Sequence, residues 1–233
     1  MPSFPAACRY FALLILPLSL AACVSVQNTL PQDIPVNSSA LDVHNRSGWN
    51  GTFGNASFDV GGFRVSHIRH EITDKSSFSI GPFRENHTKG GFSFTLDGTS
   101  ASWRVKCNKE FNSNVVKVFG VDGVSNKVFL RCNLQGATAQ QQAHFELLDE
   151  MEPLNGTVSI DGKRYALRPY AYGNVRHDVI PAPLGFRIDG NAGNLAALEL
   201  RSPGRFWLNK DLSSPEQDAL VGVMAALLIH TWS

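Results

Sequence analysis

The chain has 233 residues, of which 43% are hydrophobic and 18% charged, and its formal net charge is +1 at pH 7. Near-neutrality without a run of Lys and Arg argues against nucleic-acid binding, which depends on clustered cations that neutralise phosphates. The length is enough for one domain with a substantial hydrophobic core.

The first 22 residues have the layout of an export signal. Arg9 precedes an apolar run at 10–20, and two alanines follow it. This order predicts a signal peptide over residues 1–22 that is removed from the mature chain. The run is also shorter than the about 20 residues that a helix needs to span a bilayer, so we do not expect a permanent transmembrane anchor here.

The end of this segment, Leu20-Ala21-Ala22-Cys23, resembles the lipobox of bacterial lipoproteins. The resemblance implies that Cys23 takes a diacylglycerol and becomes the first residue of the mature chain. In Gram-negative members an Asp after the cysteine favours the inner membrane, so Val24 implies the outer membrane. The alternative is ordinary secretion with Cys23 as a bystander.

Export and lipidation together predict the role of each of the four cysteines. Cys8 is lost with the signal and Cys23 carries the lipid, which leaves Cys107 and Cys132. Two thiols in an oxidising compartment are expected to pair as a disulfide. Such a bridge would stabilise the fold by roughly 3.5 kcal/mol in the chain-entropy view. Two buried free cysteines are the alternative.

A tether is predicted between the lipid and the folded domain. Residues 24–39 are polar, contain Pro31 and Pro35, and show no helical or strand periodicity. A flexible coil of this length reaches roughly 20–25 Å. We therefore expect the lipidated cysteine and tether over residues 23–40 and a single domain over residues 41–233.

The domain is predicted to be mainly β, because short alternating segments are separated by Gly, Asn and Asp. Apolar residues share one face in three such segments, namely Phe92, Phe94 and Leu96, then Trp103, Val105 and Cys107, and then Val128, Leu130, Cys132 and Leu134. Turn signals lie at Asp97-Gly98, Asp122-Gly123, Asn155-Gly156, Asp161-Gly162, Asp189-Gly190 and Pro203-Gly204. Roughly ten to twelve short antiparallel strands fit this pattern.

One helix is predicted at the C-terminus, over about 215–230. Ser214 can cap it, Pro215 suits its first position, and Gln217 has capping-box spacing. Residues 219–229 are all apolar or Gly, so the helix must be buried on every side. We expect an antiparallel barrel closed around it, with His230 as a cation at its C-terminal end.

This arrangement resembles the tubby-like fold shared by tubby C-terminal domains, LURP-one-related proteins and phospholipid scramblases. The local likeness comprises Gly185-Phe186-Arg187-Ile188, 195–200, 204–208 and the terminal helix. These are core and turn residues, so the likeness implies the fold. Members of these families bind phosphoinositides or move lipids, but their functional motifs cannot be placed in this chain.

A loop-rich region beside the predicted strands could bind a ligand. Basic residues and aromatic rings gather there, which suits a binding surface. The candidate residues are Lys163, Arg164, Arg168, Tyr170, Tyr172, Arg176 and His177. A solvated strand face and ordinary barrel packing are the alternatives.

Two histidine motifs are candidates for chemistry. His67 and His70 flank a possible zinc-protease pattern, but their i, i+3 spacing in a strand points them to opposite faces, which excludes that site. His177-Asp178 could serve a hydrolase, yet no nucleophile motif accompanies it. We therefore assign no catalytic residue, no metal and no cofactor.

The sequence thus predicts a non-enzymatic envelope lipoprotein, held by its lipid at the outer membrane of a Gram-negative bacterium. It is expected to bind a lipid or an envelope protein. A hydrolase using His177 and Asp178, and a structural component of a surface complex, remain the alternatives.

Overall fold

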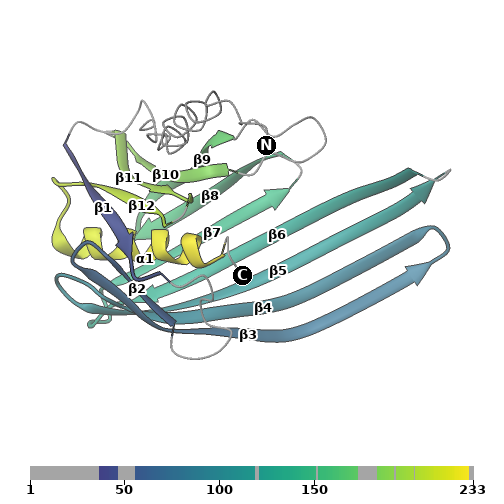
Figure 1. Ribbon diagram of the computed structural model, residues 1–233, viewed down its shortest axis with the longest axis horizontal. Coiled ribbons are helices and arrows are strands. Elements are labelled where there is room, and N and C mark those ends of the chain that lie inside the picture. Colours follow the sequence, from purple (N-terminus) through teal and green to yellow (C-terminus); the bar gives the residue numbers. More distant parts are fainter. Residues whose placement is uncertain are drawn as a thin grey trace, which may run out of the picture. The chain divides into compact units, whose positions relative to one another are not determined.

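Twelve antiparallel strands and one helix form the described part of a computed structural model, which comprises residues 37–46, 56–118, 121–150, 152–172, 183–191, 193–201 and 203–230. Successive strands pair with each other and β1 pairs with β12, so the sheet closes into a barrel (Figure 1). The elements are β1 Ser38–His44, β2 Ala56–Val60, β3 Phe63–Ile80, β4 Phe83–Asp97, β5 Ser102–Val118, β6 Val121–Gln135, β7 Gln142–Glu150, β8 Glu152–Ile160, β9 Lys163–Tyr172, β10 Pro183–Gly190, β11 Gly193–Glu199, β12 Arg205–Asn209 and α1 Ser214–His230. The predicted fold class is confirmed.

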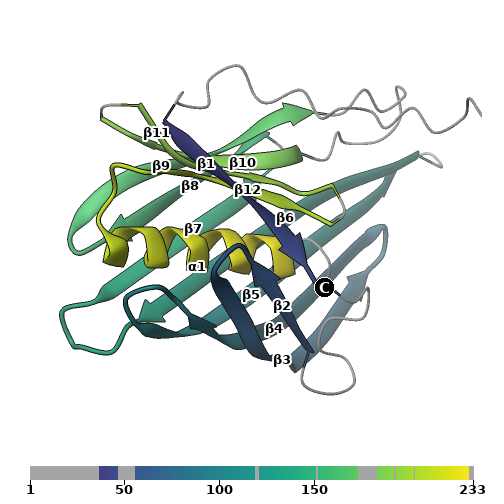
Figure 2. The ribbon, with the colours of Figure 1, turned by 60° about the vertical axis from the view of Figure 1, so that its left-hand side comes forward.

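Helix α1 runs through the barrel (Figure 2). Every residue from Asp218 to Ile229 is buried, and the helix contacts β5 to β8, β11 and β12. The strand residues predicted to share an apolar face, including Phe92 and Trp103, supply the surrounding core. Each fully buried Leu or Phe side chain contributes about 1.5–3 kcal/mol, so this packing is the main source of stability.

The start of α1 differs from the prediction by one residue. The first intrahelical bond runs from the Gln217 N–H to the Ser213 carbonyl, so Ser213 is the N-cap in place of Ser214. The Ser213 hydroxyl and backbone N–H both donate to Glu216, at 2.8 and 3.3 Å, so Glu216 closes the capping box and Gln217 does not. Gln217 instead donates its side-chain amide to the Leu212 carbonyl.

A buried carboxylate ties α1 to the turn between β4 and β5. Asp218 is fully buried and accepts hydrogen bonds from the backbone N–H groups of Thr99, Ser100 and Ala101. The hydroxyls of Thr99 and Ser100 donate to it as well. Because one turn donates all five of these hydrogen bonds to a buried carboxylate, Asp218 fixes the turn against the helix.

Three predicted turns fall inside strands, and one of them, Asp189-Gly190, forms the paired end of β10, where Gly190 pairs with Gly193. Asn155-Gly156 lies inside β8, where a Cβ on Gly156 would come within 2.4 Å of the Glu146 carbonyl oxygen, so this glycine permits close strand pairing. Asp122-Gly123 lies inside β6, because pairing with β5 continues as far as Val118 and Val121. The turn at Asp161-Gly162 is confirmed, with φ of 48° and 81° at its two residues.

The barrel begins earlier than the predicted domain boundary. Ser38, Ser39 and Ala40 already pair with β12, so the last three residues assigned to the tether belong to β1. The short Ser-Ser-Ala run carries no alternation of its own, and its position is fixed by the partner strand. Asn37, just before β1, is also described, whereas the signal peptide, Cys23 and tether residues 24–36 lie outside the described residues.

The predicted disulfide is present. Cys107 on β5 and Cys132 on β6 are directly opposite in register, both are buried, and their sulfur atoms are 2.00 Å apart. The alternative of two free thiols is therefore excluded in this structure.

Four strands continue past the barrel. β2 pairs with β3 only through residues 63–68, and β7 pairs with β6 only through 127–135. β3 to β6 run on together beyond these limits and extend past the end of α1 (Figure 1). We call residues 71–80, 83–90, 109–118 and 121–127 the projecting sheet.

Candidate functional site

The inner face of the four long strands changes character where it leaves the barrel. Inside the barrel one cross-strand row holds Phe92, Cys107 and Cys132, all buried. In the next row Gly90 and Lys109 replace the apolar residues on β4 and β5, whereas Leu130 on β6 is still buried. On β4 and β5 the core therefore ends at this row.

Two adjacent glycines shape this transition. A Cβ on Gly91 would lie 2.4 Å from the Cys107 carbonyl oxygen, and one on Gly90 would lie 3.1 Å from the Glu71 carbonyl oxygen. A β-bulge in β3 between Ile72 and Asp74 lies beside them. Bulges bend a strand, and glycines let the neighbouring backbones approach, so this position combines the two features that curve a sheet.

A cavity of about 220 Å³ opens here on the inner face. Its lining combines aromatic rings with cationic side chains that come from β3, β4 and β5. The described lining residues are His70, Glu71, Lys75, Thr88, Lys89, Gly90, Gly91, Phe92, Lys109 and Phe111.

The described lining carries more positive than negative charge. Lys75, Lys89 and Lys109 accompany a single described carboxylate, Glu71. The Lys89 Nζ atom lies 3.9 Å from a carboxylate oxygen of Glu110, a residue that does not line the cavity. Burial lowers the pKa of Lys109, which is only partly exposed. An anionic group entering the cavity would therefore meet an ammonium group that is partly removed from water, where its charge acts more strongly.

His70 adds a polar edge to the aromatic wall. Its ring centroid lies 6.0 Å from that of Phe92, and its Nε2 atom is buried without a hydrogen-bond partner. A buried polar atom without a partner costs free energy, so a ligand that could reach Nε2 would recover that cost.

The inner face continues outward from the cavity toward the tips of the strands. Phe111 and Val115 follow Lys109 on the same face of β5 and are half-buried. A second hollow near the tip has a lining that includes Val115 and Arg84. Phe111 and Val115 are separated on this face by the buried Ser113, so the face is a mixed surface with apolar side chains between the cations at its two ends.

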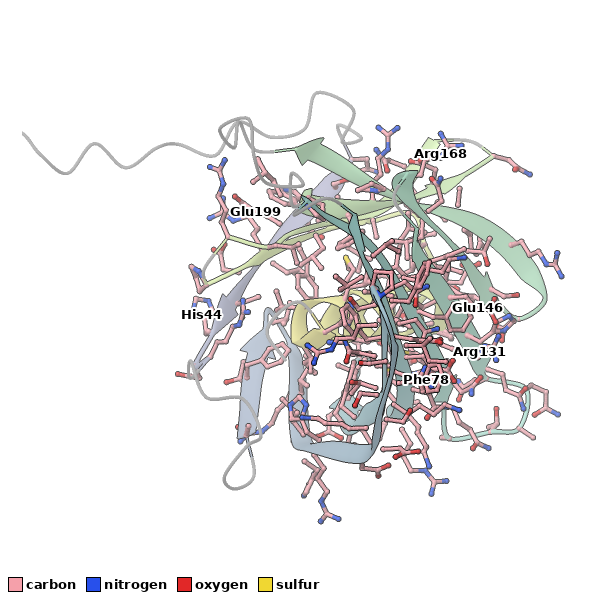
Figure 3. The ribbon with its side chains drawn as sticks, turned by 90° about the vertical axis from the view of Figure 1, so that its right-hand side faces the viewer. His44, Phe78, Arg131, Glu146, Arg168 and Glu199 are labelled. Atoms are coloured by element: carbon pink, nitrogen blue, oxygen red, sulfur yellow. A yellow bond between two sulfur atoms is a disulfide. The ribbon has the colours of Figure 1, made fainter. Side chains whose placement is uncertain are left out.

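The side chains of three of the sequence-predicted ligand residues are described, and all three lie on β9. Lys163 lies at the N-terminal end of α1, where its Nζ atom is 2.9 Å from Glu216. Arg164 and Arg168 are exposed on β9, and Arg168 lies 3.9 Å from Asp189. Figure 3 places Arg168 on a different side of the barrel from Phe78 in the projecting sheet.

The side chains of the other predicted ligand residues lie outside the described part of the structure. Only the backbone of Tyr170 and Tyr172 is described, within β9. Arg176 and His177, together with Asp178 of the hydrolase alternative, lie outside the described residues.

The two histidines of β3 line different hollows. His70 lines the cavity on the inner face, whereas His67 lines a shallow hollow on the outer face beside Arg69 and Lys106. His67 has φ of 54° in the β-bulge that precedes Arg69. The expected separation of these side chains is confirmed. Among the described residues, no three His, Cys, Asp or Glu side chains gather as a metal site would require.

His230 is not the cationic cap that the sequence suggests. Burial lowers its pKa to about 3, and the charge of Lys109 acts in the same direction. The imidazole is therefore neutral at pH 7, because the end of α1 is enclosed by the strands that also hold Lys109.

Comparison with known proteins identifies no relative: no family model, no curated protein and no solved structure matches this chain. In the described part of the chain, α1 is too short to qualify as a membrane-spanning helix.

Proposed function

We propose that this chain is a non-enzymatic, lipid-anchored envelope protein of the outer membrane that binds an amphiphile with an anionic head group. The cavity between the barrel and the projecting sheet carries this proposal, because Lys75 and Lys109 lie there beside Phe92 and Phe111. The lipobox resemblance supports the anchor and the address.

The cavity is smaller than the roughly 300–1,000 Å³ of pockets that enclose drug-sized ligands. Its volume of about 220 Å³ suits one end of a longer molecule. On the inner face Phe111 and Val115 follow the cavity, with the small Ser113 between them, so an acyl chain could contact both apolar side chains while its head group meets the cations. Burial of that chain contributes about 0.8 kcal/mol per CH₂.

Native mass spectrometry of the detergent-extracted full chain tests this proposal. The protein is incubated with palmitate or with lysophosphatidylglycerol, and retained ligand is measured after detergent removal. We expect retention of one molecule, and a loss of at least about tenfold in the double variant Lys75→Gln and Lys109→Gln, because each charged contact is worth about 1.5–3 kcal/mol.

Lys106→Gln is the matched control. Lys106 lies on β5 three residues before Lys109, but it is exposed on the outer face. Retention should be unchanged in this variant. Absence of ligand in the wild type, or equal losses in the control and the double variant, would contradict the proposal.

The predicted anchor is tested separately. Cys23→Ser should abolish incorporation of labelled palmitate into the chain and release the protein from the membrane fraction. Unchanged labelling would show that Cys23 is a bystander. Cell fractionation of the wild type then decides between the inner and the outer membrane.

A further inference from the structure

The outer edge of β3 has no partner strand among the described residues beyond its pairing with β2. That pairing ends at Ile68, whereas β3 continues to Ile80 with β4 on its other side only. Alternate residues of an antiparallel strand direct both their N–H and C=O groups to one side. The edge therefore presents a row of backbone donors and acceptors to any strand that reaches it.

The last seven residues of β3 form the regular part of this edge. Residues 74–80 pair with β4 without interruption, after the β-bulge between Ile72 and Asp74. Phe78 and Ile80 lie in this stretch with 60% and 62% of their surface exposed. Proteins usually protect a long edge with charges, Pro or a covering element, and an exposed apolar edge is a site for strand pairing.

We propose that this edge pairs antiparallel with the same edge of a second copy of the chain, around a two-fold axis at Ser77. This register pairs all seven residues, 74–80, of each copy. It places Lys75 opposite the partner's Ser79 and Asp74 opposite the partner's Ile80.

The side chains at the edge favour this register. Centring the axis on Lys75 would place two ammonium groups opposite each other, which is destabilising. Centring it on Phe78 would pair only residues 76–80. With Ser77 at the axis, small hydroxyl side chains occupy the centre, and no like charges are opposed.

The same register gathers the exposed apolar side chains. Phe78 lies opposite the partner's Ser76 and diagonally beside the partner's Phe78. Diagonal neighbours in an antiparallel sheet are about 7–8 Å apart, which aromatic side chains span. The two sheets would then become one continuous sheet with both Phe78 rings near its centre. A two-fold interface of this kind is self-limiting and gives a dimer.

Native mass spectrometry of the detergent-extracted full chain gives the oligomeric state, and we expect a dimer. In the variant Ser77→Cys, mild oxidation should link the two chains, because residue 77 faces its own copy. Ser79→Cys is the matched control on the same strand, and it should remain unlinked because it faces the partner's Lys75.

A charge at the edge gives a second test. Phe78→Lys brings two cations together near the axis and should weaken self-association by about tenfold or more. Leu148→Lys changes another exposed apolar residue, 39% exposed on β7, and should leave the dimer intact. A monomeric wild type, linkage through residue 79 in place of residue 77, or equal effects of the two Lys substitutions would overturn the proposal.

Discussion

The barrel and the projecting sheet share four strands but are stabilised in different ways. In the barrel half, β3 to β6 surround α1, and side chains such as Phe92, Leu96 and Trp103 are buried. In the projecting half the same strands are held by backbone pairing, and Phe78, Ile80 and Phe83 are about 60% exposed. The difference teaches that strand pairing can continue without a core, and that the outer half is available for binding.

Polar groups show the same contrast. In the barrel half Asp218 is buried and accepts five hydrogen bonds from one turn. Arg131 and Glu146 form an exposed pair at 2.7 Å on the outer face, and Figure 3 shows them side by side. Buried polar groups therefore organise the barrel, whereas exposed pairs contribute little.

The largest expected effect comes from Asp218→Ala. Three backbone N–H groups of the β4–β5 turn would lose a charged acceptor, and each hydrogen bond to a charged group contributes about 1.5–3 kcal/mol. We expect the free energy of unfolding in urea to fall by at least about 3 kcal/mol. Asp74→Ala, an exposed carboxylate in the projecting sheet, should change it by less than about 0.5 kcal/mol. Equal effects would contradict the contrast between the two halves.

Two phenylalanine substitutions make the next comparison. Phe92→Ala removes a buried ring from the barrel and should cost about 3–5 kcal/mol in the free energy of unfolding. Phe78→Ala removes an exposed ring from the projecting sheet and should cost less than about 1 kcal/mol under conditions where the chain is monomeric. A large loss for Phe78→Ala would mean that the projecting sheet has a core of its own.

His230 predicts how stability depends on pH at the junction of the two halves. Its pKa is lowered from 6.5 to about 3, so between these values the unfolded chain binds a proton that the folded chain does not. Stability should therefore fall as the pH drops below 6.5, by about 3 kcal/mol at pH 4. His230→Gln should lose less stability than the wild type over this window, measured by urea unfolding at pH 7 and pH 4. Parallel losses in both proteins would show that His230 is not the cause.

Glu216 has the smallest expected effect. Hydrogen bonds from Lys163 and then from Ser213 lower its pKa, so its contribution is present above its ordinary pKa and is lost as the pH falls through the folded value. The stability difference between the wild type and Glu216→Gln should thus shrink as the pH is lowered from 6 toward 3. Glu85→Gln, an exposed acid of the projecting sheet, serves as the control and should show no such trend. A difference that stays constant with pH would exclude this role.

The sequence predicts the barrel half better than the projecting half, for a physical reason. Burial of one face imposes alternation on Phe92, Phe94 and Leu96, and burial on all sides makes residues 219–229 wholly apolar. These patterns can be read without knowing the strand partners. Where β3 to β6 continue beyond the core, their sequences show no such alternation, because both faces of the projecting sheet carry mixed side chains.

The candidate site was harder to predict for the same reason. His70 is recognisable as one of a histidine pair, but Lys75, Lys109 and Phe111 come together only through the register of β3, β4 and β5. The adjacent Gly90 and Gly91 are the one local signal of a break in the sheet. Asp218 was also missed, since its partners are more than 110 positions away in the chain.

Photochemical labelling tests the central claim most directly, namely that the inner face of the projecting sheet binds an amphiphile. Palmitate with a diazirine group on its chain is bound to the detergent-extracted protein, irradiated, and located by peptide mass spectrometry. The account predicts labels on inner-face residues of β4 and β5, within 84–92 and 107–115, and their loss in the double variant of Lys75 and Lys109. Labels confined to the outer face around Arg69 and Lys106, or to β9 around Arg164 and Arg168, would contradict it.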